Sequence, residues 1–116
     1  MKTLFLLLAP LAACTMHAAT MPDAPATGTV NYTCTDGYVV PVTFGMQDDG
    51  TKSVVLKVDG NSYTLLKAKS ATGTRYAWPS DGSNFVWQIQ GGVGTVLWHD
   101  GTSGTEQPRF TDCRAS

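Results

Sequence analysis

The sequence of 116 residues lacks the features that mark several common classes of protein. It has no run of basic residues and no arginine-rich stripe, and its formal net charge is −1, which argues against a nucleic-acid partner. No segment keeps a hydrophobic period of 3.6 residues over several turns, so an α-helical fold is not indicated. The length suits one small domain.

Residues with a spacing typical of catalysis or metal binding are also scarce. Five of the nine acidic residues stand in Asp-Gly pairs, where a turn accounts for them. The other four show no pattern of paired catalytic carboxylates: Asp23, Asp48, Glu106 and Asp112. His99 stands alone, and neither a nucleophile elbow nor the Cys and His spacing of a metal site is present. We therefore predict a protein that is not an enzyme and that uses no metal or cofactor.

Residues 1–13 have the pattern of a signal peptide. Lys2 supplies a positive charge, residues 4–9 form an apolar run, and small residues follow. The apolar run is too short for a membrane-spanning helix. The pattern disfavours the alternative, a buried N-terminal helix.

The end of this segment, Leu11-Ala12-Ala13-Cys14, resembles the bacterial lipobox. The resemblance implies that cleavage leaves Cys14 at the N-terminus and that acyl chains such as palmitate are attached to it. Thr15 follows Cys14, and no Asp stands at this position. This resembles lipoproteins that are sorted to the outer membrane, which implies a protein that is anchored there and faces the periplasm. The anchor would be durable, because each buried methylene contributes about 0.8 kcal/mol.

The rest of the chain divides into a tether and a domain. Residues 14–28 are rich in Ala, Thr and Pro without periodicity, which predicts a flexible tether, and residues 29–116 form the predicted domain. With Cys14 lipidated, Cys34 and Cys113 remain, and an exported protein can join them in a disulfide. Such a bridge would stabilise the domain by roughly 4–5 kcal/mol in the loop-entropy model. The alternative is two free buried thiols.

The domain reads as short apolar runs separated by turn signals. Apolar residues alternate in several of them, and five Asp-Gly pairs offer tight turns at hairpin spacing. The expected strands are residues 30–34, 38–44, 53–58, 62–66, 75–78, 84–90, 95–99 and 109–113. We predict an all-β fold, a small antiparallel β-barrel of seven or eight strands with one disulfide. Pro41 predicts an edge or a bulge in the second strand.

The tryptophans leave two interpretations open. Trp78, Trp87 and Trp98 could form a platform on which sugars stack. Trp87 and Trp98 alternate with other residues in predicted strands, which favours the core for these two.

The stretch Ser70-Ala71-Thr72-Gly73-Thr74-Arg75-Tyr76 lies between two predicted strands. Its small and hydroxylated residues predict a surface loop, because they cannot pack a core. The loop ends in an arginine and a tyrosine, which are frequent anchors of protein interfaces.

Several short motifs together resemble one family. They are Tyr32-Thr33-Cys34 before an Asp-Gly turn, the loop at residues 70–76, Phe85-Val86-Trp87, Gly94-Thr95-Val96 and the closing Cys113. In this order they resemble the membrane-bound inhibitors of c-type lysozyme, the MliC/PliC family, over about residues 30–113. The loop is the most specific of these motifs.

The resemblance implies that the loop enters the active-site cleft of a c-type lysozyme and so protects bacterial peptidoglycan from host defence. Thr72 would donate a hydrogen bond to a catalytic carboxylate, Gly73 would set the loop and Tyr76 would brace it. Ser70, Arg75 and Gly91 belong to the implied binding region, although Arg75 could equally be a solvated charge. Gln90 would be a second contact. Two positions depart from the family pattern: Thr72 replaces a serine, and Gln90, after one extra residue, replaces a lysine.

Two other classes of function remain open from the sequence. One is a small barrel that binds an apolar ligand, which bound lipid after purification would favour. The other is a structural or adhesion lipoprotein of the envelope, which a pull-down of partners without lysozyme would favour.

The variant Gln90→Lys tests the resemblance. A hydrogen bond from a charged group is worth about 1.5–3 kcal/mol, against roughly 0.5–1.5 kcal/mol for a neutral one. We expect Gln90→Lys to inhibit a c-type lysozyme about tenfold more tightly. Unchanged inhibition would show that the alignment at Gln90, or its role, is wrong.

Overall fold

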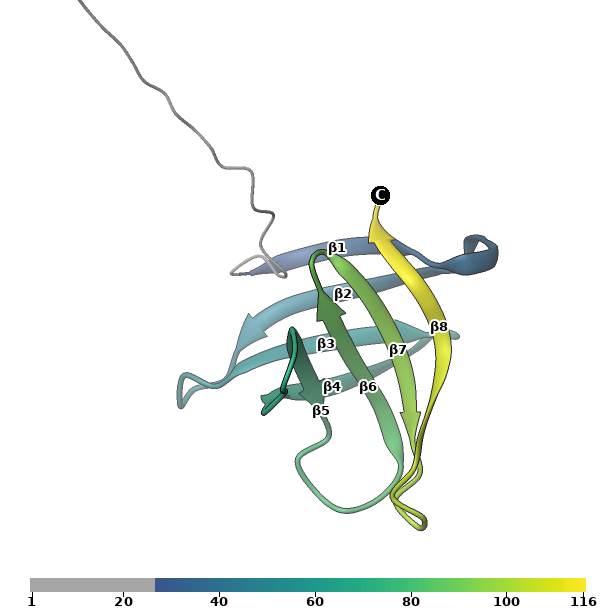
Figure 1. Ribbon diagram of the computed structural model, residues 1–116. Coiled ribbons are helices and arrows are strands. Elements are labelled where there is room, and N and C mark those ends of the chain that lie inside the picture. The colour runs from purple at the N-terminus through teal and green to yellow at the C-terminus, as the bar shows by residue number, and fades with distance from the viewer. Residues whose placement is uncertain (1–26) are drawn as a thin grey trace, which may run out of the picture.

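The computed structural model describes residues 27–116, which form a closed antiparallel barrel (Figure 1). Each strand pairs with the next along the chain, and the last pairs with the first. The strands are β1 (Gly28–Thr33), β2 (Val39–Met46), β3 (Lys52–Val58), β4 (Asn61–Ala68), β5 (Thr74–Ala77), β6 (Asn84–Gln90), β7 (Val93–His99) and β8 (Glu106–Ala115). The all-β prediction with eight strands is confirmed.

Helical structure is almost absent from the described residues. One short 3-10 turn, η1 (Thr35–Gly37), joins β1 to β2. No helix within residues 27–116 is long and apolar enough to cross a membrane. The predicted signal peptide and the tether up to residue 26, including Cys14, lie outside the described residues, so these assignments stay predictions.

Asp-Gly pairs supply most of the connections, as their turn chemistry predicts. Asp59 and Gly60 have φ angles of 51° and 82° and make the two-residue turn between β3 and β4. Five of the seven connections contain such a pair: Asp36-Gly37, Asp49-Gly50, Asp59-Gly60, Asp81-Gly82 and Asp100-Gly101. The other two are the β4–β5 loop and the Gly91-Gly92 turn between β6 and β7. The chain therefore forms successive hairpins with one distinctive loop among them.

Alternating apolar residues fill the barrel interior. Phe85, Trp87 and Ile89 of β6 are all buried, as are the alternating apolar residues of β2 and β3. Trp87 is fully buried and its ring centroid lies 4.8 Å from that of Tyr32. A Cβ atom on Gly94 would come within 2.2 Å of the Trp87 ring, so β7 needs glycine there. Side chains thus occupy the centre of the barrel, where a ligand-binding barrel keeps a cavity.

The other two tryptophans lie nearer the surface. Trp98 is partly buried and packs against the core, whereas Trp78 is 44% exposed. Core positions for Trp87 and Trp98 agree with the alternation in the sequence. The three side chains therefore do not share one exposed face.

Pro41 belongs to a strand of the closed barrel wall, at a position where the pairing with one neighbouring strand is missing. β2 pairs with β1 from Val39 to Phe44, whereas its pairing with β3 begins only at Val42. Pro41 therefore has a registered partner, Asn31, on one side only. β2 is not an edge strand, yet its proline stands where one neighbour is missing, as the lack of an N–H donor favours.

The seam that closes the barrel is short. β1 and β8 share two registered pairs, Tyr32 with Ala115 and Thr33 with Arg114. The Cys34–Cys113 disulfide spans a sequence separation of 79 and joins the same two segments beside these pairs. The predicted pairing of these cysteines is confirmed, and the disulfide supports the barrel where it has few ladder hydrogen bonds.

Removing the disulfide should destabilise the barrel strongly. We expect the double variant Cys34→Ala/Cys113→Ala to lose about 4 kcal/mol of unfolding free energy, because a long loop in the unfolded chain is released. Urea denaturation followed by tryptophan fluorescence measures this loss. The reduced wild-type protein should behave like the variant. Equal stability of the oxidised wild type and the variant would contradict the role of the seam.

Candidate functional site

The β4–β5 loop, residues 69–73, is held in shape by a small hydrogen-bond clamp. The Ser70 hydroxyl donates to the Thr72 carbonyl oxygen at 2.5 Å. The Gln88 amide, on β6, donates to the same carbonyl at 2.9 Å and to the Ser70 hydroxyl at 2.9 Å. The Thr72 backbone is therefore fixed by donors from two sides.

Gly73 brings this loop directly against the end of β6. Its φ is +63°, and a Cβ atom there would lie 2.4 Å from the Ile89 carbonyl oxygen and 2.9 Å from the Gln90 Cβ. Both the left-handed backbone and the lack of space require glycine. The loop thus lies beside Gln90, although seventeen positions separate residues 73 and 90 in the sequence.

The turn after Gln90 completes the neighbourhood of the loop. Gln90 is exposed and pairs with Val93 across a two-residue turn, Gly91-Gly92, whose φ angles are 60° and 82°. Positive φ at both positions suits glycine and makes a tight hairpin. The structure therefore brings together Thr72, Gly73, Gln90 and Gly91, four of the residues singled out in the sequence.

Thr72 and Ser70 use their polar groups differently. Within residues 27–116, the hydrogen bonds of Thr72 are made by its carbonyl oxygen, and its exposed side chain keeps a hydroxyl that can donate. The Ser70 hydroxyl is engaged twice, once as donor and once as acceptor. The Ser70 hydroxyl therefore helps to hold the loop, whereas the Thr72 side chain takes no part in this clamp.

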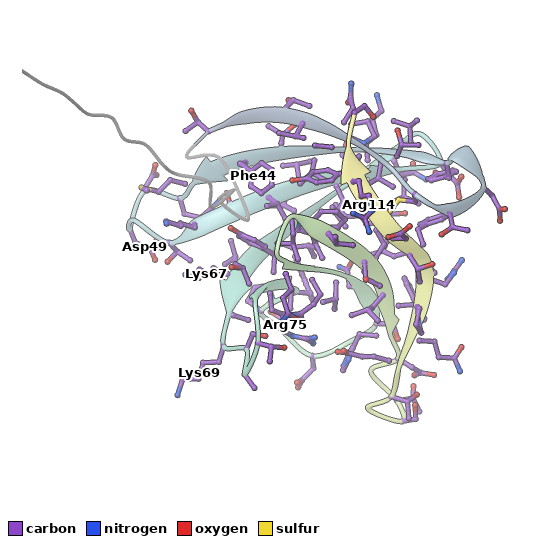
Figure 2. All side chains as sticks on the ribbon, turned by 45° about the horizontal axis from the view of Figure 1, so that its top comes forward. Phe44, Asp49, Lys67, Lys69, Arg75 and Arg114 are labelled. Atoms are coloured by element: carbon purple, nitrogen blue, oxygen red, sulfur yellow. A yellow bond between two sulfur atoms is a disulfide. The ribbon has the colours of Figure 1, made fainter. Side chains whose placement is uncertain are left out.

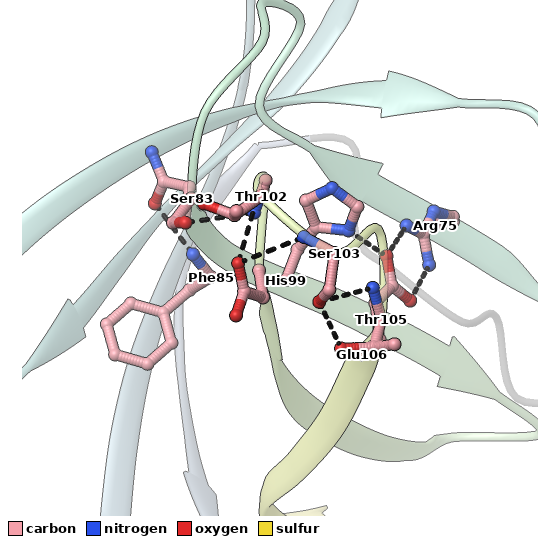
Figure 3. Close-up of polar contacts among 11 residues, drawn as sticks. Arg75, Ser83, Phe85, His99, Thr102, Ser103, Thr105 and Glu106 are labelled. Carbon is pink, nitrogen blue, oxygen red and sulfur yellow. Dashed lines mark hydrogen bonds and ion pairs between the residues drawn. The ribbon is translucent and has the colours of Figure 1, made fainter.

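Tyr76 and Arg75 follow the loop on β5 and face opposite sides of the barrel wall. Tyr76 is 2% exposed, and its ring meets Phe44 edge to face with centroids 6.3 Å apart. Its position suits a brace beneath the loop. Arg75 lies on the outer side, where its guanidinium donates twice to Glu106 on β8, once at 2.9 Å from Nη1 to Oε1 (Figure 3).

Glu106 contacts two basic or titratable side chains on the outer wall. Besides Arg75, the His99 Nδ1 atom lies 2.8 Å from Glu106 Oε2. The hydrogen bonds from Arg75 hold the pKa of Glu106 below its usual value, and His99 adds to this effect. The positive charge of Arg75 is therefore neutralised within the protein, in a pair whose side chains are 23% and 24% exposed.

Two lysines border the loop on its β4 side. An open depression of about 750 Å³ is lined by residues 67–71, 73 and 74. Lys67 and Lys69 are both exposed, and Figure 2 shows them projecting at the β4 end while Arg75 lies on the other side of the loop. The loop is thus flanked by lysines on one side and by Gln90 on the other.

Two contacts in this region could not be predicted from the sequence. The pairing of Arg75 with Glu106 joins residues 31 positions apart, and no sequence pattern links them. The Gln88 clamp was also missed, although alternation along β6 does place Gln88 outward, between buried Trp87 and Ile89.

Comparisons with known proteins assign this chain to one family and match its fold. The family model described as "Membrane-bound lysozyme-inhibitor of c-type lysozyme" matches residues 32–104, more than half of the chain. The chain therefore belongs to this family of lysozyme inhibitors, which is described as membrane-bound and whose partner is c-type lysozyme.

A solved structure supports the fold independently. The crystal structure of PliC-St, a periplasmic lysozyme inhibitor of C-type lysozyme from Salmonella typhimurium, superposes with a TM-score of 0.63. The two chains are 17% identical, and the alignment covers 78% of this chain and 98% of the other. No curated protein matches this sequence.

The clamp predicts a specific effect of Gln88. The variant Gln88→Ala removes two hydrogen bonds to the loop, each worth about 0.5–1.5 kcal/mol. We expect faster amide hydrogen exchange in residues 70–73 and about tenfold weaker inhibition of c-type lysozyme. Gln107→Ala, an exposed glutamine on β8, is the matched control and should change neither. Unaltered exchange in the loop of Gln88→Ala would show that the clamp does not order it.

Proposed function

We propose that this protein inhibits c-type lysozyme by placing the β4–β5 loop in the active-site cleft, with the Thr72 hydroxyl donating a hydrogen bond to a catalytic carboxylate. The observation that carries the proposal is that the backbone and the side chain of Thr72 have different roles. Its carbonyl is held by Ser70 and Gln88, while its side chain is exposed and carries a hydroxyl that can donate. A donor fixed in this way meets an acceptor with little further loss of conformational freedom.

The chemistry of the target fits this donor. A c-type lysozyme cleaves its glycan with one protonated and one ionised carboxyl group in the cleft. A hydroxyl that donates to the ionised group forms a charge-assisted hydrogen bond, worth about 1.5–3 kcal/mol. The loop then fills the space that the sugar needs, so inhibition comes from occupation of the cleft, and the inhibitor itself is not an enzyme.

The other residues of the region take distinct parts in this proposal. Gln90 and Gly91 approach the enzyme from the neighbouring β6–β7 turn as a second, neutral contact. Ser70, Gly73 and Tyr76 shape and brace the loop. Arg75 holds β5 to β8 through Glu106 and contributes to rigidity.

We further propose where the inhibitor acts. The lipobox at Cys14 and the membrane-bound description of the family support a lipid anchor. With Thr15 after the acylated cysteine, the anchor lies in the bacterial outer membrane and the domain faces the periplasm. There it would protect peptidoglycan from lysozyme that crosses the outer membrane.

Thr72→Glu tests the proposed contact directly. The variant places a carboxylate against the carboxylates of the cleft, so we expect at least a hundredfold loss of inhibition of c-type lysozyme. Thr64→Glu, an exposed threonine on β4, is the matched control and should inhibit like the wild type. The assay follows lysis of peptidoglycan by c-type, g-type and i-type lysozymes in the presence of the full chain. Equal inhibition by Thr72→Glu and the wild type would refute the loop contact.

A further inference from the structure

Lys52 of β3 and Lys67 of β4 lie at one rim of the barrel. Val54, Leu56 and Val58 of β3 face the core, and Lys52 continues this row by one step beyond the buried part. Lys67 continues the row of Tyr63 and Leu65 on β4 in the same way. The inward rows end at the open rim, so both lysines are exposed there.

These two lysines also stand opposite each other. The β3–β4 ladder places Ser53 against Leu66, so Lys52 and Lys67 are the next positions along the two strands. Like charges across a strand pair repel each other. Lys69 follows two residues later at the start of the loop, which makes this rim rich in positive charge.

The rim lysines are not neutralised by ion pairs within the described domain. The salt bridges of residues 27–116 involve Arg75, His99 and Arg114 as the basic partners. The acids nearest in sequence are Asp48 and Asp49 for Lys52, and Asp59 for Lys67 and Lys69, and none of the three is in an ion pair with a lysine of the described residues. Asp49 accepts a hydrogen bond from the Thr51 N–H at 2.9 Å. Lys67 and Lys69 also line the depression beside Thr72. Their charge is therefore free to meet an anionic group of a partner.

We infer that Lys67 and Lys69 form the cationic contact of the inhibitor, which meets the ionised carboxylate and neighbouring acidic groups of the lysozyme cleft. This inference rests on the proposed function. Arg75 is neutralised by its ion pair with Glu106, and Gln90 carries no charge. Positive charge near the loop therefore comes from its β4 side, whereas the hydrogen-bond donor comes from its centre.

The geometry explains why lysine suits these positions. Lys69 lies three residues before Thr72, at the base of a loop held by a clamp. A lysine carries its ammonium on a flexible four-carbon stem, so it can reach an acidic group beside the hydroxyl contact without a fixed geometry. Such contacts between exposed charges weaken as salt screens them, with a Debye length of about 10 Å at 0.1 M.

The test compares four variants of the full chain in the lysozyme assay between about 20 mM and 300 mM salt. Lys67→Met and Lys69→Met keep the stem and remove the charge. Lys57→Met is the matched control, because Lys57 is exposed but alternates with the core residues Leu56 and Val58. The fourth variant combines Lys69→Met with Gln90→Lys, which returns a charge to the other side of the loop.

We expect Lys67→Met and Lys69→Met each to weaken inhibition by about 3–10-fold at low salt and to reduce its salt dependence. Lys57→Met should match the wild type, and Gln90→Lys should recover most of the loss of Lys69→Met. If the wild type inhibits, and both lysine variants inhibit as strongly as the wild type with the same salt dependence, the inference is overturned while the proposed function stands. If the wild type inhibits no c-type lysozyme, the proposed function fails and this inference fails with it.

Discussion

The closure of the barrel between β1 and β8 is the constraint on which the rest of the structure depends. Every other strand pair joins neighbours along the chain, whereas this one joins the two ends of the domain through two registered pairs. The Cys34–Cys113 disulfide holds the same ends together. Once the cylinder is closed, each described strand has a neighbouring strand on both sides, and β5 and β6 have fixed places in the wall. These two strands carry the loop and its clamp.

The loop owes its shape to β6 more than to its own sequence. The Gln88 amide donates to the Thr72 carbonyl and to the Ser70 hydroxyl. The Ile89 carbonyl leaves room only for a glycine at position 73. The same arrangement sorts the polar groups near the loop by task. Arg75 pairs with Glu106 on the outer side of the wall, the exposed Thr72 side chain carries a hydroxyl that can donate, and Lys67 and Lys69 lie beside it. A rigid scaffold with an exposed donor suits an inhibitor that blocks a preformed cleft.

Local patterns predicted the fold, and contacts between distant segments limited the prediction of the site. Asp-Gly pairs indicated hairpins because both residues tolerate positive φ, and the alternation of Phe85, Trp87 and Ile89 indicated one buried face. β8 begins at Glu106, earlier than the predicted start at residue 109. The first residues of this strand show little alternation between buried and exposed positions, so no periodic pattern marked them as a strand. The Arg75–Glu106 pair and the Gln88 clamp depend on how the wall closes, so no short motif could reveal them. The nearness of Gly73 to Gln90 was implied by the family resemblance, and the structure supplies its physical cause.

A crystal structure of the complex with a c-type lysozyme tests the central claim most directly. The account predicts that residues 69–73 occupy the active-site cleft, with the Thr72 hydroxyl oxygen about 2.6 Å from an oxygen of a catalytic carboxylate. It also predicts the same loop conformation as in the free protein, because the clamp forms before binding. A complex in which the opposite end of the barrel contacts the enzyme, or in which the cleft stays open to solvent, would contradict it.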